Sequence, residues 1–516
     1  RHRRGMQIVL LLAVAINSAA EYNPPPTILD TDYGSFIDDI FAVGLFLQST
    51  DVLDPRLILT TSEEPEWSAN CVSEQIARSD LGFEVPIAIG ETLPPYSERG
   101  TVCGIPGLIG FALYDTCAAS PSKELPPPIP NGVEHAATML IESNRTDWTY
   151  IAIGGQTSLQ KLIRDYPEAL SKIQNLVVMG GNFCTGFDAY PDVPTPTAET
   201  NIGCDMVAAN FVLEAAAKAN EQGRHFPTIQ YVPIVTVNVL SGDDYSLITD
   251  AASPTNNNPH YSQAAHATID FYNAWSTNAR ANESLLIHKE AMTFDPLTES
   301  TPQFDAVAVL VAMDIARGAA NSRVAQHEFA NGVHFVTNQE AELAQEHPEF
   351  FKGKPAPAAY SLWSGYEPSI NDKLDAGTPL SGRGRCKSLT PYHYDPSVAS
   401  PSISSDATRN HLPPAPPVPI QAALGFHSDE AEEDFFHEMA LRISGRFALL
   451  DAQSCEVTTH PATPTATVGM AASVECDAKG TEQNVSIAPA STSSLSSPTT
   501  QSSRSRLAIE ECSIMA

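Results

Sequence analysis

Short apolar runs alternate with amphipathic stretches between about residues 25 and 320. The runs have the length of buried strands, and the stretches between them repeat apolar residues at helical spacing. The predicted strands are residues 56–61, 86–90, 150–154, 176–180 and 229–237, and the predicted helices are residues 67–78, 133–142, 158–166 and 206–219. Apolar strands that alternate with helices indicate an α/β domain, in which helices cover both faces of a mainly parallel sheet.

The pattern becomes less regular after about residue 320. A mixed extension that includes Trp363 completes the predicted domain, which we place at residues 21–390. Residues 391–425 are rich in Pro and Ser and are predicted to be a linker or a surface strap. Residues 426–452 predict one amphipathic helix, and the Ser-, Thr- and Pro-rich tail at residues 453–516 has the low-complexity composition of a disordered segment.

Acidic residues cluster where the first apolar run ends. The four acids that end this run and open a predicted helix over residues 38–47 are Asp30, Asp32, Asp38 and Asp39. Gly34 lies between the two pairs and permits a turn there. Carboxylates this close repel one another unless a cation lies among them, and Ca²⁺ suits a flexible, carboxylate-rich site. A solvated acidic turn that caps the helix is the alternative interpretation.

The balance of charge limits the partners that the chain can have. Its 516 residues carry a formal net charge of −32, with an isoelectric point of about 4.6. Such a surface repels nucleic acid and anionic membranes, so we expect a small neutral or cationic substrate. Solubility, which acidic surfaces favour, is the simpler interpretation of the same charge.

The start of the chain has the pattern of a secretory signal peptide, which we assign to residues 1–20. Three arginines form a basic region, residues 8–16 form an apolar stretch too short to span a bilayer, and small residues at 18–20 offer a cleavage site. We therefore expect a secreted, extracellular protein without a stable membrane anchor, and a membrane-anchored protein is the alternative.

Nine cysteines fit an oxidising compartment, in which most of them should pair. Their spacing makes Cys103 with Cys117, and Cys184 with Cys204, plausible bridges, although sequence does not fix the connectivity. The three N-glycosylation sequons begin at Asn144, Asn282 and Asn484. Together these features add to the expectation of a secreted, disulfide-bonded glycoprotein.

Later segments also place small or polar residues after an apolar run. They comprise Ile153 before a glycine pair, Met179 before a second glycine pair, Glu199 with Asn201, and Asp305 at the start of an apolar helix. The spacing of Glu199 and Asn201 predicts that both lie on one side of an extended segment. Because ligands bind beyond the carboxyl ends of parallel strands, these segments are candidates for one site.

This ordered set resembles the nucleoside hydrolases of the inosine–uridine-preferring type. The resemblance covers residues 26–318 and rests on Asp30-x-Asp32-x-Gly34 with Asp38-Asp39, Met179-Gly180-Gly181, Ala198-Glu199-x-Asn201 and Asp305-Ala306-Val307-Ala308. It implies a Rossmann-like α/β fold and a Ca²⁺-dependent hydrolase that splits the N-glycosidic bond of a ribonucleoside into free base and ribose. It also suggests a homodimer or a homotetramer.

The resemblance implies a role for each matching residue. Asp32 would be a Ca²⁺ ligand and the general base for the attacking water. The other implied Ca²⁺ ligands are Asp39, the main-chain carbonyl of Ile153 and Asp305. The residues that would bind the substrate are Asp38, Met179, Glu199 and Asn201. Asp30 would lie behind Asp32 and orient it.

Some positions depart from the pattern of the family. Residues 60–65 lack the Asn that commonly contacts ribose there, and Phe304 stands where some members carry a His linked to protonation of the leaving group. Phe304 and Asn182 are candidates for contact with the base. Trp67 and Trp275 are interpreted as packing residues rather than platforms for a base.

Two other functions are alternatives to the hydrolase. A nucleoside- or sugar-binding protein of the same fold, without turnover, is favoured by Phe304 and the missing Asn. The intact set of Asp32, Asp39 and Asp305 opposes it. A phosphatase of the Asp-x-Asp type would need a basic residue at a later strand end to hold phosphate, and we find no convincing one in the sequence.

Overall fold

The computed structural model describes residues 22–34, 37–79, 84–94, 113, 117, 126–181, 200–234, 236–253, 263–283, 288–318, 322–329, 333–335, 362–364 and 420–447. The chain up to Gly445 belongs to one compact unit, and residues 446–516 form a second. No helix among these described residues is long and apolar enough to cross a membrane.

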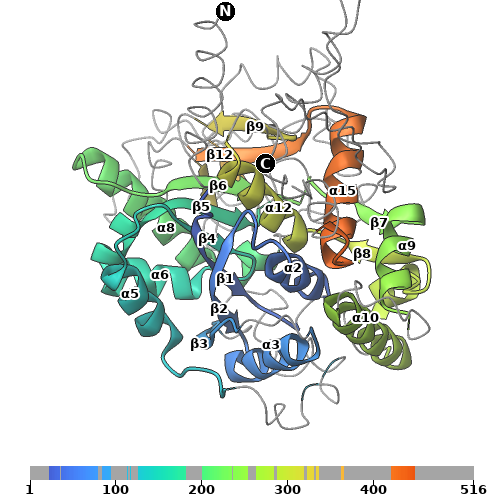
Figure 1. The fold of residues 1–516 in the computed structure, drawn as a ribbon. Coiled ribbons are helices and arrows are strands. Elements are labelled where there is room, and N and C mark those ends of the chain that lie inside the picture. Colours follow the sequence, from blue (N-terminus) through green and yellow to red (C-terminus); the bar gives the residue numbers. More distant parts are fainter. Residues whose placement is uncertain are drawn as a thin grey trace, which may run out of the picture. The chain divides into compact units, whose positions relative to one another are not determined.

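Eight strands form the central sheet of the first unit (Figure 1). They are β1 (Pro26–Thr31), β2 (Asp54–Ser62), β3 (Ile87–Thr92), β4 (Trp148–Ala152), β5 (Ile173–Met179), β6 (Thr228–Val232), β9 (Val324–Phe329) and β12 (Ile420–Phe426). Their order is β3-β2-β1-β4-β5-β6-β12-β9, and all neighbours are parallel except β12 with β9. The predicted mainly parallel sheet is therefore confirmed. β6 is shorter than predicted because Pro233 follows it and cannot donate a ladder hydrogen bond.

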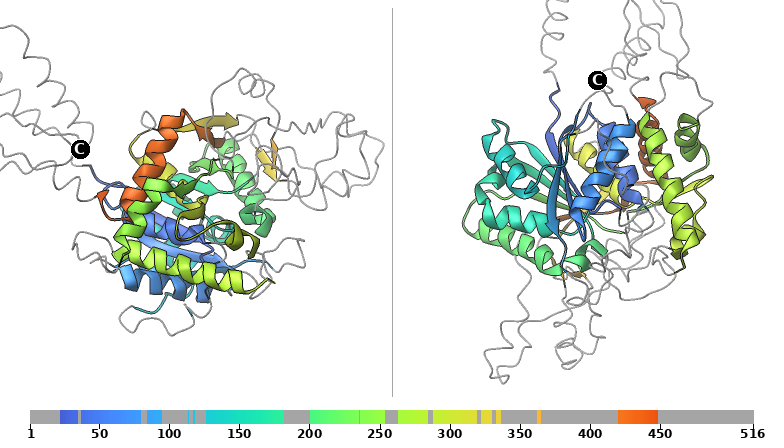
Figure 2. Two further views of the ribbon diagram at one scale, coloured as in Figure 1. Left: turned by 90° about the vertical axis from the view of Figure 1, so that its right-hand side faces the viewer. Right: turned by 90° about the horizontal axis from the view of Figure 1, so that it is seen from below.

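Helices cover both faces of this sheet (Figure 2). One core contains apolar residues of α5 (Gly132–Glu142), α6 (Thr157–Asp165) and α8 (Met206–Glu221). The other contains residues of α2 (Asp38–Leu47), α3 (Pro65–Ser79), α9 (Gly242–Ala251), α10 (Gln263–Ala281), α12 (Asp305–Ala316) and α15 (Asp429–Ile443). The remaining elements are the 3₁₀ helix η3 (Pro167–Lys172), α7 (Thr200–Cys204), α11 (His288–Thr293), the pair β7 (Val239–Ser241) and β8 (Glu299–Pro302), and the pair β10 (Val333–Phe335) and β11 (Leu362–Ser364).

Helices α2 and α12 lie deepest in the second core. All of α2 is buried, and α12 is buried from Asp305 to Asp314. They pack against each other, with α10 and α15 against α2 and with β5 against α12. A helix that is apolar on all sides is stable only when it is surrounded in this way. Side chains at their N-terminal ends are therefore carried on rigid supports.

The end of the described chain differs from the prediction. Residues 420–425, expected to belong to a linker, form most of β12, which lies between β6 and β9 in the main sheet. This apolar strand was not predicted because it directly follows a proline-rich segment, which is typical of a linker. The predicted helix over residues 426–452 corresponds to the shorter α15, which packs against α2, α9 and α12. The compact unit therefore continues past residue 390, whereas the predicted signal peptide and tail lie outside the described residues.

The disulfide at Cys117 also differs from the prediction. Cys117 pairs with Cys71 of α3, across 46 residues of sequence and a Cα–Cα distance of 4.9 Å, so the predicted bridge to Cys103 is wrong. Cys71 is fully buried, and a buried helix position brings cysteines together that the sequence keeps apart. Cys204 is disulfide-bonded as well, but Cys184 lies outside the described residues, so that pairing stays a prediction.

Ion pairs of buried side chains connect α15 to the rest of the unit. Glu438 accepts hydrogen bonds from Arg317 at 2.5 and 3.0 Å and from Nε of Arg442 at 2.7 Å. A third guanidinium, that of Arg323, lies 2.8 Å from the same carboxylate. Arg442 is only 1% exposed and also donates to both carboxylate oxygens of Asp51, at 2.6 and 2.9 Å. Arg442 and Glu438 thus tie α15 to the ends of α2 and α12.

Glu438 should make part of the stability dependent on pH. Burial alone would raise the pKa of Glu438, but the hydrogen bond from Arg317 and the charges of Arg442 and Arg323 outweigh burial and lower the pKa to about 2 from 4.5. Because the folded pKa is depressed, this carboxylate stabilises the fold fully above about pH 4.5, and about 3 kcal/mol is lost as the pH falls toward 2. Urea unfolding at a series of pH values from 6 to 2.5 should show that the difference in free energy of unfolding between wild type and Glu438→Gln becomes smaller as the pH falls. A gap independent of pH would contradict this assignment.

Candidate metal centre and active site

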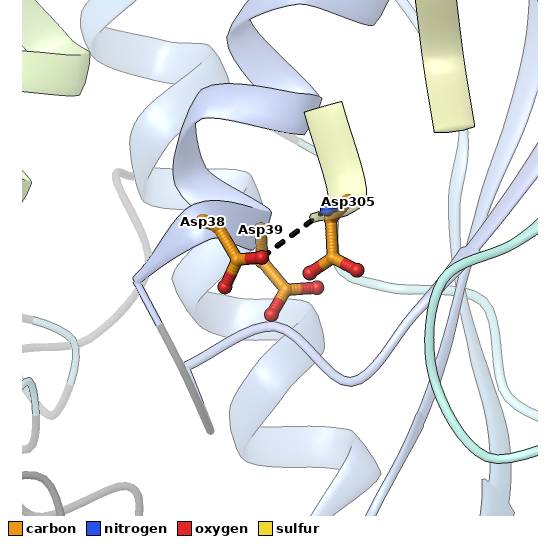
Figure 3. Close-up of side chains that lie close together, drawn as sticks. All are labelled: Asp38, Asp39 and Asp305. Atoms are coloured by element: carbon orange, nitrogen blue, oxygen red, sulfur yellow. Dashed lines mark hydrogen bonds between the residues drawn. The ribbon is translucent and has the colours of Figure 1, made fainter. Parts of the chain in front are cut away.

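Three carboxylates meet between the N-terminal ends of α2 and α12 (Figure 3). Asp38, Asp39 and Asp305 are all buried, and each offers an oxygen within 4.8 Å of the others. Asp38 and Asp39 open α2 and Asp305 opens α12. The positive ends of two helix dipoles therefore face the acids and partly offset their mutual repulsion. The structure thus brings the opening acidic motif together with an acid more than 260 residues later.

Asp38 links the two helices. Its Oδ2 accepts hydrogen bonds from the backbone N–H groups of Phe304, at 3.1 Å, and Asp305, at 3.2 Å. These N–H groups belong to the first turn of α12, whose N-cap residue, Phe304, has no side-chain oxygen to satisfy them. Asp38 therefore fixes the start of α12 in the site. Its predicted contact with ribose stays a prediction.

Asp39 gives the strongest indication of a cation site. Its Oδ1 accepts a hydrogen bond from Oγ1 of Thr31, whereas its Oδ2 is buried and has no hydrogen-bond partner in the described part of the chain. Leaving a buried carboxylate oxygen unpaired is costly unless a cation binds it. The three acids offer only oxygen atoms, which fits a hard divalent cation such as Ca²⁺ or Mg²⁺.

The acids of the site have raised pKa values in the absence of a cation. Burial, followed by the charge of Asp38, raises the pKa of Asp39 well above its usual value. Burial, followed by the charges of Asp39 and Glu63, does the same for the pKa of Asp32. Burial also raises the pKa of Asp38 to about 6, although its hydrogen bonds to the start of α12 oppose the rise. A bound cation would favour the charged forms of all these acids.

Asp32 lies beside the three-carboxylate cluster. It is 3% exposed and close enough to Asp39 for their charges to interact, yet it is outside the set whose oxygens lie within 4.8 Å. The turn after β4 passes very close to it, because a Cβ added at Gly154 would lie 2.8 Å from the backbone nitrogen of Asp32. The predicted roles of Asp32 as base and metal ligand stay predictions.

The turn after Asp32 depends on Gly34. Gly34 has a φ of +93°, which L-residues rarely adopt, and a Cβ there would lie 2.5 Å from Cζ3 of Trp67. Trp67 packs against the core and Trp275 is fully buried in it. Both tryptophans therefore have the packing role that the sequence predicted.

Asp30 is held by the two strands that flank β1. Thr61 of β2 donates from Oγ1 to Oδ1 of Asp30, and the hydroxyl of Tyr150 of β4 donates to Oδ2 at 2.7 Å. Burial raises the pKa of Asp30 to about 7, although both hydrogen bonds oppose the rise. The backbone carbonyl of Asp30 accepts from the N–H of Ile153 at 2.7 Å. Asp30 therefore joins the ends of three strands at the start of the acidic motif, and its predicted role in orienting Asp32 stays a prediction.

Asn201 contacts two other predicted site residues, Ile153 and Met179. Nδ2 of Asn201 donates to the carbonyl of Ile153 at 2.9 Å and lies 3.1 Å from Sδ of Met179. A carbonyl oxygen has two lone pairs, so Ile153 can still offer one to a cation. Asn201 lies in the short helix α7, so the predicted extended segment is wrong at this position. Glu199 and Asn182 lie outside the described residues.

Sequence reasoning missed the residues that hold the acids. Thr31 carried a signal, since it follows Asp30 in the strand and therefore faces the opposite side of the sheet, where its hydroxyl meets Asp39 of α2. Thr61 and Tyr150 carried none, because their contacts depend on strand order. Phe304 is partly buried against the core, and its predicted contact with a base stays a prediction.

The sequence of the chain matches the model of a known protein family. Residues 27–355 match the model described as inosine-uridine preferring nucleoside hydrolase. The chain belongs to this family. The match ends before β12 and α15, so these two elements of the compact unit lie outside the part of the chain that the nucleoside hydrolase model covers.

Curated nucleoside hydrolases match the chain over part of its length. A non-specific ribonucleoside hydrolase, RihC of Klebsiella pneumoniae, is 31% identical over 199 residues, which are 37% of this chain and 58% of the relative. A pyrimidine-specific ribonucleoside hydrolase, RihA of Escherichia coli, is 32% identical over 198 residues, which are 37% of this chain and 57% of that protein. The chain thus aligns with less than two thirds of the length of these relatives.

Solved structures of nucleoside hydrolases resemble the chain more distantly. A plant nucleoside hydrolase, PpNRh1, is 16% identical with a TM-score of 0.47, covering 82% of this chain and 99% of its own. A purine-preferring ribonucleoside hydrolase from Gardnerella vaginalis is 14% identical with a TM-score of 0.48, covering 81% and 99%. The assignment to the family rests on the sequence match and not on these likenesses.

Proposed function

We propose that the chain is a secreted, Ca²⁺-dependent hydrolase of the N-glycosidic bond of ribonucleosides, which releases free base and ribose. The observation that carries the proposal is the buried Oδ2 of Asp39, which has no hydrogen-bond partner among the described residues and lies beside Asp38 and Asp305. Membership of the nucleoside hydrolase family supports the class of reaction. A set of ligands made only of carboxylate and carbonyl oxygens supports Ca²⁺ as the resident ion.

The residues of the chain have distinct tasks in this reaction. Asp32, Asp39 and Asp305, with the carbonyl of Ile153, would hold the cation. Asp38 lies with Asp39 and Asp305 in the carboxylate cluster and would border the ribose as well. When bound, the cation would lower the pKa of water and offset the repulsion among the acids. Asp32 accepts the proton of the attacking water, as a general base close to the cluster.

The remaining task is to stabilise the sugar. Cleavage of a glycosidic bond builds positive charge on the sugar ring. The negative field of the buried acids stabilises this charge, and the acids need not move to do so. Asn201 holds the carbonyl of Ile153 and the sulfur of Met179 in fixed positions. Met179 and Asn201 would thereby border the ribose, as the resemblance implies.

Secretion has independent support. Cys71 and Cys117 form a disulfide and Cys204 is also disulfide-bonded. Disulfides persist in oxidising compartments and are rare in the cytosol. Expression in a eukaryotic host should deliver the protein to the medium, with peptide mapping showing glycans at the predicted sequons. Retention of unglycosylated protein inside the cell would contradict the proposal.

The Asp32→Asn variant separates the hydrolase from a binding protein of the same fold. In wild type, we expect release of reducing sugar from a panel of ribonucleosides. Asp32→Asn should keep the fold and nucleoside binding while turnover falls by about 10³-fold or more, because the general base is lost. Full activity in Asp32→Asn would rule out the assigned mechanism. Binding without release in wild type would favour the binding protein.

The contact of Gly154 with Asp32 gives a second prediction. A Cβ at Gly154 would meet the backbone of Asp32 at 2.8 Å, and backbone cannot move aside cheaply. Gly154→Ala should therefore displace Asp32 and lower kcat/KM by about 100-fold, as misplacement by about 1 Å typically does. Gly223→Ala is the control for backbone strain without a clash, since Gly223 has a φ of +61° and a Cβ there meets nothing within 4 Å, so it should cost some stability and leave kcat/KM unchanged. Equal kinetics for the two variants would show that the close approach has no role.

A further inference from the structure

We propose that Glu63 is a further substrate-side residue of this site, whose carboxylate stabilises the positive charge that develops on the sugar. The inference rests on the proposed function and deepens it. It predicts that the site distinguishes a cationic sugar from a neutral one partly through Glu63, a residue outside the cluster that would hold the metal.

The position of Glu63 is fixed by the turn that joins β2 to α3. Oγ1 of Thr60 donates to the carbonyl of Pro65 at 2.7 Å, and the hydroxyls of Ser62 and Ser68 lie 2.8 Å apart. The N–H of Ser68 donates to the carbonyl of Glu64 at 3.0 Å. Hydrogen bonds on both sides thus hold the backbone of Glu63, so its side chain starts from a defined point.

The same turn lies beside the acidic motif. Strands β1 and β2 are parallel neighbours, with Thr31 opposite Thr60, and both end at the same edge of the sheet. Asp32 is the first residue after β1, and Glu63 is the first residue after β2. Between these strand ends, Thr61 bonds to Asp30. The two carboxylate-bearing residues therefore follow adjacent strands at the edge where parallel sheets bind ligands.

The surroundings of Glu63 suit contact with substrate. Glu63 is partly exposed, whereas the acids of the cluster are buried. Its carboxylate lies near enough to Asp32 for the two charges to interact. A carboxylate at this border stabilises positive charge on a bound sugar and adds little to the binding of a neutral one.

The test compares Glu63→Gln with wild type, both loaded with Ca²⁺. Calorimetry would measure the affinity for ribose and for a protonated pyrrolidine analogue of ribose. In Glu63→Gln, affinity for the cationic analogue should fall by about tenfold or more, while affinity for ribose should change by less than about twofold. Likewise, kcat should fall with little change in KM.

Glu64→Gln is the matched control. Glu64 is the next residue in the same turn and is exposed, so the variant removes the same charge without the predicted loss. An unchanged preference for the cationic analogue in Glu63→Gln overturns the inference alone. Equal losses for ribose and the analogue also overturn it, since they indicate general damage to the site. If wild type neither prefers the cationic analogue nor releases ribose, the proposed function fails as well.

Discussion

Asp39→Asn should abolish tight Ca²⁺ binding and turnover without unfolding the protein. The substitution removes a buried oxygen of the carboxylate cluster that has no hydrogen-bond partner in the part of the chain that the structure describes. Loss of a group that only supports a metal ligand commonly costs 10- to 100-fold in metal affinity, so loss of a ligand should cost about 100-fold or more. Calorimetric titration with Ca²⁺, beside an assay of ribose release, measures both effects.

Without metal, the same variant should lose no stability relative to wild type. The folded pKa of Asp39 is raised, so in the metal-free protein the ionised carboxylate costs stability as the pH rises above its unfolded pKa. Asn carries no charge, so metal-free Asp39→Asn should be at least as stable as metal-free wild type at pH 8. Asp165→Asn, in an exposed pair with Arg164, should alter neither property. Normal Ca²⁺ affinity in Asp39→Asn would show that the cluster is not the metal site.

Arg442→Ala should destabilise the fold by about 3–5 kcal/mol, the usual cost of breaking a buried ion pair from one side. Arg442 is 1% exposed, and its removal leaves Glu438 with two guanidiniums and Asp51 without its buried partner. Arg442 lies beyond the family match, which ends at residue 355, yet its ion pairs hold α15 beside α2. Unfolding in guanidinium chloride at pH 7 measures the loss.

The control for Arg442 is an ion pair at the surface. Arg56 pairs with Asp54 at 2.6 Å, but its side chain is 55% exposed. Exposed pairs contribute about 0–1 kcal/mol, so Arg56→Ala should have a small effect. If Arg442→Ala also costs less than about 1 kcal/mol, α15 is held by its apolar face, through residues such as Phe435 and Met439, and not by its charges.

The sequence predicted the elements that have a strong local pattern. The helix from Asp38 to Leu47 and the apolar runs within strands β4 and β5 were expected because their patterns differ sharply from those of the adjoining segments. β12 was missed because it is separated from the other strands by a long segment and follows a run of prolines. Its place between β6 and β9 is set by tertiary packing that local periodicity does not encode.

The candidate site was predicted in part for a related reason. The acids Asp38, Asp39 and Asp305 stand in local motifs, so their residue types and positions indicated the chemistry. Their arrangement could not be predicted from the sequence. It depends on which helix ends and strands become neighbours, as in the capping of α12 by Asp38 and the hydrogen bond from Thr61 to Asp30. The helical setting of Asn201 was missed because a single turn of helix leaves almost no periodic signal.

The most direct test of the central claim is a titration of metal-free wild-type protein with Ca²⁺, in which occupancy and ribose release are measured on the same samples. The account predicts that ribose release rises in proportion to occupancy of one site and disappears when a chelator removes the ion. Undiminished release of ribose from fully metal-free protein would contradict the account.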